Sequence, residues 1–179
     1  MIKHLILIRH GKSSWAPYSR KNFVGDDHQR PLNHRGKMAA KDLSVHLGLT
    51  IGSIDKIFSS SAVRATKTLK IIEENVKTNY KSEIEPRLYT FEEEKLLEYI
   101  KETDNRLQNI AIIGHNPAIQ KLCTLLIERN SFGGFYEKLS EKFPTCGTAL
   151  IKLRARTWRE VTQNCGYLES FITPKSISD

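Results

Sequence analysis

The sequence lacks any long hydrophobic run. Its longest nearly apolar stretch covers residues 5–8, far short of the ~20 residues that a helix needs to cross a bilayer. The segment 1–8 is also too short for the hydrophobic region of a secretory signal, and it leads directly into Arg9 and His10. The sequence therefore predicts a cytoplasmic protein without membrane attachment.

Cysteines are few and far apart. The three are Cys123, Cys146 and Cys165. An odd number without close spacing is typical neither of a disulfide framework nor of a zinc knuckle or redox motif. We therefore expect reduced thiols, no metal site and no cofactor.

Extremes of composition are absent as well. Of the 179 residues, 39% are hydrophobic and 27% are charged, which excludes collagen-like, low-complexity and wholly disordered chains. At roughly 100–200 residues per domain, the length predicts one globular domain over 1–179. A short flexible tail is expected from about residue 173.

Negative charge is in short supply. The chain has 28 Lys and Arg against 20 Asp and Glu, which gives a formal net charge of +8. Such an excess raises the local concentration of anions, including phosphate esters, phosphoproteins and nucleic acid. The charge therefore indicates the sign of a partner but not its identity.

Hydrophobic patterning predicts strands that alternate with helices. Segment 2–8 is a nearly continuous aliphatic run, typical of a strand covered by helices on both faces. Apolar residues spaced by four, three and four positions predict an amphipathic helix over 61–76. Further strands are predicted at 54–59, 110–113, 148–153 and 167–172, further helices at 33–47, 91–102 and 117–127, and loops at 16–31 and 129–148. Asn33 is expected to cap the helix 33–47 and Gly48 to end it. This order predicts a three-layer α/β/α fold around a mainly parallel sheet.

Basic side chains follow three of the predicted strands. Arg9 and His10 follow the first strand, Arg64 the second, and His115 a later one. Taken singly, each is explained by polar residues that leave the core, and Asn116 with Pro117 by a helix cap and a first helical residue. Ligands of such sheets bind beyond the carboxyl ends of the strands. We therefore expect the four basic side chains to meet at one edge of the sheet.

Two guanidinium groups and two imidazoles around one point would form a pocket for a phosphate dianion. Guanidinium forks match phosphate oxygens, and the helix N-termini that follow add backbone donors. One imidazole, kept neutral by a hydrogen bond through its other nitrogen, can attack phosphorus, while the second shields the charge of the anion. The pattern predicts covalent phosphoryl transfer through a phosphohistidine, with no metal required.

These residues resemble the histidine phosphatase superfamily, the phosphoglycerate mutase-like group, whose hallmark is Arg-His-Gly after the first strand. Here that motif is Arg9-His10-Gly11, and matching segments occur at 27–32, 35–36, 60–68, 114–117 and, more loosely, 143–148. The Asp-x-x-Arg-Pro-Leu segment at 27–32, the short length and the absence of large insertions are most similar to the SixA-type branch, the phosphohistidine phosphatases. The resemblance implies a phosphoglycerate mutase-like fold.

The resemblance also implies catalytic roles for four residues. His10 would be the nucleophile that becomes phosphorylated, and His115 the second histidine of the pocket. Arg9 and Arg64 would bind the phosphoryl oxygens. These roles agree with the chemistry expected from the residue types alone.

Neighbouring residues are expected to assist. Gly11 and Asn116 would add contacts to phosphate or substrate. Asp27 and Arg30 would lie near the pocket mouth, where Asp27 orients an arginine, relays a proton or only forms a turn before a proline. Thr148 belongs to the loosely matching segment and is a further accessory candidate.

The sequence departs from the family pattern at the general acid. Mutases and many ester phosphatases of the superfamily carry Glu shortly after Leu, in a region that corresponds to 87–90, where this chain has Tyr89. The glutamates at 92–94 are explained by the start of a helix, where the dipole favours acids. A missing acid hinders cleavage of an alkyl phosphate more than cleavage of a phosphorylated imidazole, whose nitrogen leaves readily. The departure favours a phosphoramidate substrate and argues against mutase activity.

Three hypotheses follow. The first is a metal-independent phosphatase that acts on phosphohistidine in a signalling or phosphotransfer protein. The second is a small-molecule phosphomonoesterase of the same superfamily, in which Tyr89, Asp27 or a nearby Glu protonates the leaving oxygen. The third is a non-catalytic module that binds phosphoprotein or nucleic acid, which the +8 charge favours but no nucleic-acid-binding motif supports.

Overall fold

Six strands form one sheet in the computed structural model, which describes residues 2–15, 26–50, 54–76, 80–128 and 135–178. The order across the sheet is β3-β2-β4-β1-β5-β6. The strands are β1 (Lys3–Arg9), β2 (Lys56–Ser60), β3 (Lys81–Glu85), β4 (Asn109–Gly114), β5 (Thr148–Leu153) and β6 (Gly166–Ile172). The sheet therefore places the aliphatic strand β1 between β4 and β5.

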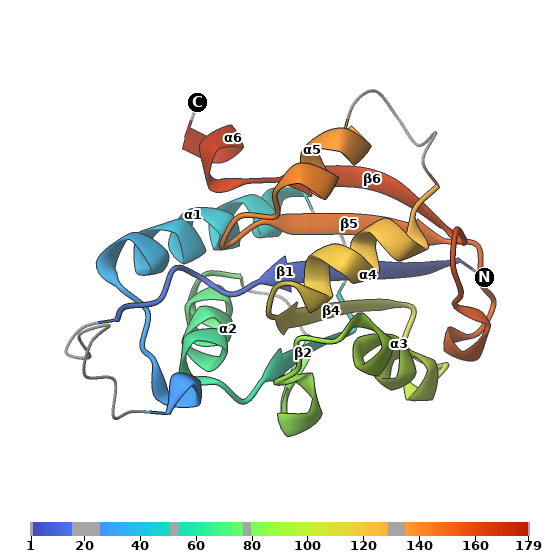
Figure 1. Ribbon diagram of the computed structural model, residues 1–179, viewed down its shortest axis with the longest axis horizontal. Coiled ribbons are helices and arrows are strands. Elements are labelled where there is room, and N and C mark those ends of the chain that lie inside the picture. The colour runs from blue at the N-terminus through green and yellow to red at the C-terminus, as the bar shows by residue number, and fades with distance from the viewer. Residues whose placement is uncertain (1, 16–25, 51–53, 77–79, 129–134, 179) are drawn as a thin grey trace.

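Strand direction explains where a ligand site can form. β1 pairs in parallel with β4, β4 with β2, and β2 with β3, whereas β5 is antiparallel to both β1 and β6. Figure 1 shows the arrowheads of β1, β2 and β4 at the same edge of the sheet. The predicted mainly parallel sheet is confirmed, with β5 as its exception.

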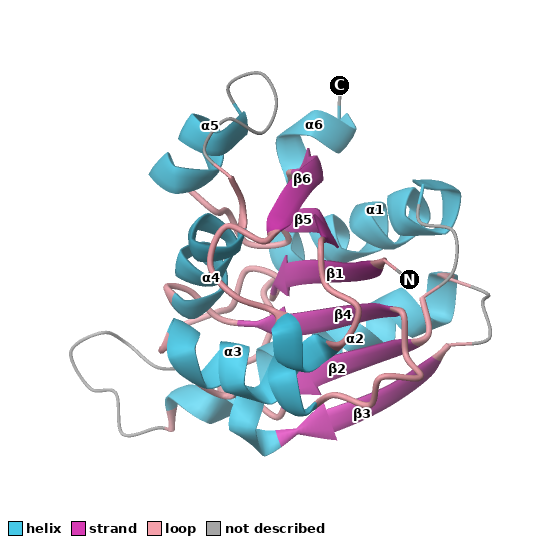
Figure 2. Cartoon of the chain, turned by 90° about the vertical axis from the view of Figure 1, so that its right-hand side faces the viewer, coloured by secondary structure: helices cyan, strands magenta, loops and turns pink. Residues whose placement is uncertain are grey.

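Helices cover both faces of the sheet, as Figure 2 shows. Alternation along β1 sends Leu5 and Leu7 to one hydrophobic cluster and Ile6 and Ile8 to the other. The first cluster lies under α3 (Glu93–Glu102) and α4 (Ala118–Leu126), and the second under α1 (His34–Thr50) and α2 (Val63–Asn75). The predicted three-layer arrangement is confirmed.

Short helices complete the structure. Three 3-10 helices are η1 (Asp27–Gln29), η2 (Pro86–Leu88) and η3 (Trp158–Glu160), and two short α-helices are α5 (Phe135–Glu141) and α6 (Pro174–Ser178). Ile177 of α6 packs against the cluster under α1, so the segment expected to be a flexible tail forms a helix. No helix of the described residues is both long and apolar enough to span a bilayer.

Several predicted boundaries are wrong. α1 continues past Gly48 to Thr50, because Gly48 faces open space and tolerates helical backbone. α2 begins at Val63 rather than residue 61, because the Ser60 hydroxyl accepts a hydrogen bond from the Ala62 N–H and holds a turn before the helix. Pro117 is the N-cap of α4 and not its first helical residue.

The strand β3 and the helix α5 were not predicted either. β3 has a polar sequence, Lys-Ser-Glu-Ile-Glu, and its residues are mostly exposed, as befits the edge of a sheet. α5 lies inside the expected loop 129–148. Residues 16–25 and 129–134, parts of the two expected loops, lie outside the described residues.

Candidate active site

His10 lies in the turn that follows β1, where two neighbouring strands hold the backbone. The His10 N–H donates to the carbonyl of Gly114, at the end of β4, at 3.1 Å. The Arg9 N–H donates to the carbonyl of Gly147, and the Cys146 N–H donates to the carbonyl of Arg9, both at 3.0 Å, just before β5. These bonds fix the direction in which the His10 side chain leaves the sheet.

The next residue, Gly11, orients the imidazole. His10 Nδ1 lies 2.7 Å from the Gly11 carbonyl oxygen, which can only accept, so Nδ1 carries the proton. The Gly11 N–H donates to Thr68 Oγ1 on α2 at 3.0 Å. A Cβ at residue 11 would lie 2.9 Å from the carbonyl oxygen of Gly36 on α1. Only glycine therefore fits where the turn passes α1.

Arg64, on the first turn of α2, connects the two histidines. Its Nε donates to His10 Nε2 at 3.2 Å, and its Nη2 lies 3.3 Å from His115 Nδ1. Because a guanidinium only donates, both of these imidazole nitrogens are acceptors. His10 Nε2 therefore holds a lone pair that faces the centre of the site.

His115 follows β4 and has the complementary tautomer. Its Nε2 lies 2.7 Å from Ser60 Oγ, at the end of β2, and donates to it. The His10 and His115 ring centroids are 5.0 Å apart, and the side chains of His10, Arg64 and His115 are 7%, 3% and 1% exposed. The structure thus brings these three predicted residues together at the common edge of β1, β2 and β4.

Arg9 borders the same site from β1. Its Nη1 donates to the Phe143 carbonyl at 2.7 Å, while its buried Nε has no hydrogen-bond partner among the described residues. Leaving a buried donor unpaired costs about 1–3 kcal/mol. Burial and the charge of Arg64 lower the pKa of Arg9. A pKa lowered in this way is expected for a buried cation that has no anion beside it.

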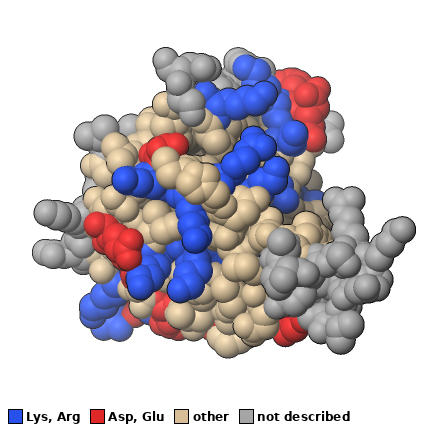
Figure 3. Space-filling view, turned by 90° about the vertical axis from the view of Figure 1, so that its left-hand side faces the viewer, with Lys and Arg blue, Asp and Glu red and all other residues tan. Residues whose placement is uncertain are grey.

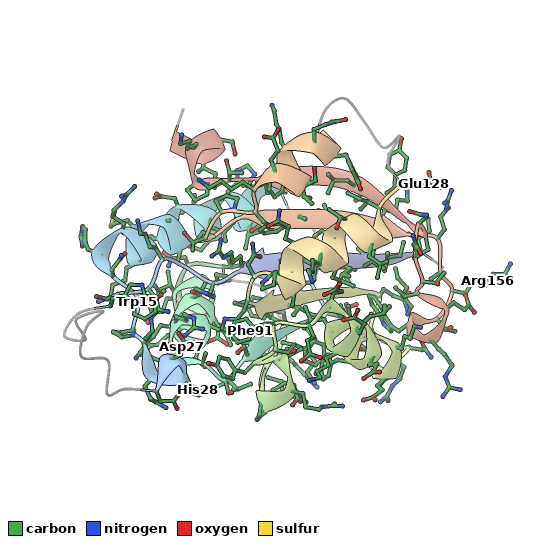
Figure 4. The ribbon with its side chains drawn as sticks, in the orientation of Figure 1. Trp15, Asp27, His28, Phe91, Glu128 and Arg156 are labelled. Carbon is green, nitrogen blue, oxygen red and sulfur yellow. The ribbon has the colours of Figure 1, made fainter. Side chains whose placement is uncertain are left out.

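Asp27 in η1 carries the negative charge at this site. Its Oδ2 accepts from Arg64 Nη2 at 2.8 Å and from the Tyr89 hydroxyl at 2.8 Å, and its Oδ1 accepts from Arg30 Nη1 at 2.8 Å. Burial alone would raise the pKa of Asp27, but the hydrogen bonds from Arg30, Tyr89 and Arg64 outweigh it and hold the pKa well below its usual range. Asp27 is therefore an ionised carboxylate that orients Arg64. Figure 4 shows Asp27, His28 and Phe91 near one another, at the edge towards which β1 points.

The other accessory residues contribute in different ways. Arg30 also donates to Ser13 Oγ and lies over the Trp15 ring, 3.5 Å from its centroid. Asn116 Nδ2 donates to the Phe143 carbonyl that also binds Arg9, at 3.3 Å. The Thr148 hydroxyl donates to the Cys146 carbonyl at 3.4 Å, inside the turn before β5. Asn116 and Thr148 therefore support the backbone around Arg9, and Arg30 supports Asp27.

Gly11, which was predicted to contact phosphate, makes hydrogen bonds within the protein in this structure. Its N–H is already bonded to Thr68, so in this structure Gly11 acts on His10 through its carbonyl. Ser60 and Thr68 bound the matching segment 60–68, but the sequence predicts no role for their hydroxyl groups, since buried hydroxyl residues near a helix start are common. Tyr89 is predicted as a substitution and as a candidate proton donor, and the structure adds that its ring packs edge-on against His115 with the centroids 5.2 Å apart.

Cys146 lies behind the site and is not a nucleophile candidate. It is fully buried with a φ of 59°. Burial raises the pKa of its thiol to about 12, so the sulfur stays protonated at neutral pH. The imidazole of His10 therefore remains the candidate nucleophile.

Burial keeps both histidines neutral. It is the largest cause that lowers the pKa of His10 from 6.5 to about 3; the hydrogen bond to Gly11 opposes the shift, and the charges of Arg64 and Arg9 add to it. Burial, the neighbouring His10 and Arg64 lower the pKa of His115 to about 2. A neutral ring retains the lone pair that a nucleophile needs.

We predict that His10 of the ligand-free protein stays neutral, with its proton on Nδ1, from pH 7 to pH 5. An exposed histidine would titrate near 6.5, so ¹⁵N–¹H correlation spectra across this range separate the two cases. The unfolded chain takes up protons near 6.5 and the folded rings do not, so stability should fall as the pH drops from about 6.5 towards 3. A His10 ring that titrates near 6.5 would contradict the prediction.

Comparisons with known proteins agree with this arrangement. Residues 5–92 match the model of the histidine phosphatase superfamily (branch 1). An uncharacterized protein of Mycobacterium tuberculosis (strain ATCC 25618 / H37Rv) is 28% identical over 169 residues, which cover 94% of this chain and 100% of that protein.

Solved structures share the fold. A Nakamurella multipartitia protein assigned as the phosphohistidine phosphatase SixA superposes with a TM-score of 0.80 at 19% identity, covering 97% of both chains. The protein histidine phosphatase SixA in complex with tungstate gives a TM-score of 0.74 at 18% identity, covering 97% of this chain and 99% of that chain. The expected fold class is confirmed.

Proposed function

We propose that this chain is a phosphatase of the histidine phosphatase superfamily and that it takes its phosphoryl group from phosphohistidine on a signalling or phosphotransfer protein. The superfamily match and the buried site also weigh against a non-catalytic binding module. The neighbours described as SixA, a phosphohistidine phosphatase, share its fold. What supports this substrate class in the chain itself is the state of the carboxylate that the described residues place at the site.

That carboxylate, Asp27, is poorly suited to donate a proton. Three donors bind it, and its pKa lies well below the usual range. The Tyr89 hydroxyl donates to Asp27, and burial together with this bond raises the pKa of Tyr89. An alkoxide leaving group needs a proton from a nearby acid. Imidazole leaves without such help, so the site suits a phosphorylated imidazole better than an alkyl ester.

The proposed reaction has two displacements at phosphorus. In the first, the lone pair of His10 Nε2 forms a bond to phosphorus while the P–N bond of the substrate breaks. The substrate phosphohistidine reacts with a proton already on its other ring nitrogen, so its side chain leaves as neutral imidazole. In the second, a water oxygen attacks phosphorus, the P–Nε2 bond breaks, and the proton lost by water remains with the inorganic phosphate. The hydrogen bond from Nδ1 to the Gly11 carbonyl fixes the tautomer that leaves Nε2 free to attack, and it stabilises the charged phosphoimidazole.

Two arginines supply the charge that the transition state requires. Phosphoryl transfer spreads negative charge over three equatorial oxygens, and preformed donors stabilise it. Arg64 faces His10 Nε2 at 3.2 Å, and Arg9 has an unpaired buried Nε. Asp27 holds Arg64 in position through two bonds, to its carbonyl and to its carboxylate. Phosphate would then share the guanidinium with Asp27.

The second candidate is a small-molecule phosphomonoesterase. One observation favours it: the Tyr89 hydroxyl is a proton-bearing group whose ring lies against His115. In this case Tyr89 would protonate the leaving oxygen. The Asp27 carboxylate beside Tyr89 would disfavour the phenolate that this step leaves behind. The raised pKa of Tyr89 makes this the weaker of the two.

A substrate panel separates the candidates. We expect kcat/KM for a phosphohistidine peptide to exceed that for a phosphoserine peptide and for sugar phosphates by about 100-fold or more, since general acid catalysis contributes about 10²–10⁴-fold. Release of inorganic phosphate measures all three. Equal turnover of a sugar phosphate that Tyr89→Phe abolishes would favour the monoesterase and contradict the proposal.

A further inference from the structure

A basic cavity adjoins the candidate active site. It has a volume of about 810 Å³ and lies between α1, the end of α5 and the segment from β6 to α6. Its lining includes six Lys or Arg residues and one acid, Asp42. The six are Arg9, Lys12, Arg35, Lys138, Lys142 and Lys175. Figure 3 shows Lys and Arg side chains gathered on the face of the molecule where β1 ends.

The positive charge of this cavity is largely uncompensated. Within the described part of the chain, Lys12, Arg35, Lys142 and Lys175 form no ion pair with an acid. Some surface cations elsewhere are paired, as Lys56 is with Glu83 and Lys95 with Glu92. Uncompensated cations around a concave surface focus the field and attract anions.

Apolar groups line the same cavity, so its ligand is more than a simple ion. Met38, Ala39, Pro144, Phe171 and Pro174 contribute to the wall. Met38 is 47% exposed, and the ring of Phe171 packs against Phe143 with the centroids 5.1 Å apart. A ligand that fits this wall carries an apolar group between its negative charges. Acidic residues around an aliphatic side chain have this character.

The cavity and the catalytic site share a border. Arg9 lines the cavity and donates to the Phe143 carbonyl, one residue before Pro144 in the cavity wall. Lys12 follows the nucleophile by two positions and also lines the cavity. A protein whose phosphohistidine reaches His10 would therefore present its neighbouring surface to the cavity.

We propose that this cavity is a docking subsite for an acidic segment of the phosphoprotein substrate, with at least two carboxylates around an aliphatic side chain. The identity of the occupant rests on the proposed function, because the cavity would position the same molecule whose phosphohistidine meets His10. Recognition is by charge and by contact with Met38 and Phe171. The catalytic residues then select substrates with a P–N bond, and the cavity selects the protein that carries this bond.

The test compares two triple variants with equal changes of charge. The cavity variant is Arg35→Glu, Lys142→Glu and Lys175→Glu. The control is Lys101→Glu, Arg156→Glu and Arg159→Glu, all exposed residues; Figure 4 labels Arg156 at the end of the molecule opposite the site. The probes are phosphoramidate, a phosphohistidine peptide flanked by glutamates and a leucine, and the same peptide with glutamines. Thermal unfolding verifies that both variants fold.

For the wild type we expect kcat/KM about tenfold higher on the glutamate peptide than on the glutamine peptide, from several exposed charge pairs acting together. The cavity variant should lose this preference and the control variant should keep it. Turnover of phosphoramidate, which is too small to reach the cavity, should stay within about twofold in both variants. Equal use of the two peptides by the wild type, or an equal loss in both variants, would overturn the inference.

A binding measurement separates this inference from the proposed function. Fluorescence anisotropy with the unphosphorylated glutamate peptide requires no chemistry, and we expect the cavity variant to bind about tenfold more weakly than the control. If phosphohistidine is not hydrolysed but this difference holds, the proposed function fails and the acidic ligand class stands. If a single-stranded oligonucleotide competes as well as the glutamate peptide does, the cavity is a general polyanion surface and the inference fails.

Discussion

Replacing His10 with alanine is expected to lower turnover of phosphohistidine by about four orders of magnitude, the scale on which removal of an enzyme nucleophile acts. The substitution removes the Nε2 lone pair that faces Arg64 and leaves the cations in place. A phosphorylated intermediate should also disappear. Intact mass measured after an alkaline quench detects the added phosphoryl group, which a P–N bond keeps in base and loses in acid.

The matched control is His4→Gln. His4 lies at the start of β1, at the other end of the strand from His10, where its Nδ1 is hydrogen-bonded to Asn109 Oδ1 at 2.9 Å. Turnover of this variant should stay within about twofold of the wild type, because distant sites act independently. A His10→Ala enzyme with full turnover, or one that still gains the phosphoryl mass, would show that another residue is the nucleophile.

Arg64→Lys is expected to lower kcat/KM by about 100- to 1000-fold, the usual loss when a preorganised donor to a transition-state oxygen is removed. Lysine keeps the charge, but its single ammonium cannot reproduce the fork that contacts His10 Nε2, His115 Nδ1 and Asp27 at once. The effect should fall mainly on kcat. Steady-state kinetics on a phosphohistidine peptide measures it.

Arg87→Lys serves as its control. Arg87 is an exposed residue that forms ion pairs with Glu85 and Glu102, and exposed pairs contribute only about 0–1 kcal/mol. It should change neither kcat nor KM beyond about twofold. If Arg64→Lys were as active as Arg87→Lys, charge alone would suffice, and the bridging geometry would have no catalytic role.

The location of the site was predictable because of one property of parallel sheets. Residues that follow parallel strands share an edge, so Arg9, His10, Arg64 and His115 could be grouped before their distances were known. The burial that keeps the two imidazoles neutral follows from the same aliphatic strands, since β1 and β4 lie inside the sheet. The roles of these four residues in catalysis stay predictions.

The contacts of Asp27 could not be deduced in the same way. Its bond to the Tyr89 hydroxyl joins residues 62 positions apart, and neither residue lies in a strand. Because η1 and η2 carry no hydrophobic period, their place is set by packing against α2 and β2. For the same reason, the sequence could not show that Tyr89 is a neighbour of Asp27 and His115.

Secondary structure could not be predicted from the sequence in segments whose hydrophobic pattern is uninformative. The edge strand β3 buries little and has a polar sequence, and α5 is a helix of only seven residues inside the segment predicted as a loop. The direction of β5 was also hidden, because an aliphatic strand has the same pattern in parallel and antiparallel pairing. The basic cavity depends on α5 and α6, so it too required the structure.

The backbone hydrogen bonds that join Arg9 to Cys146 and Gly147 affect when the chain can become active during its synthesis. β1 leaves the ribosome well before the turn at Cys146 and Gly147 that supports Arg9. A nascent or truncated chain that ends before this turn carries His10 but lacks this support. Phosphatase activity should therefore begin only after the turn has been synthesised.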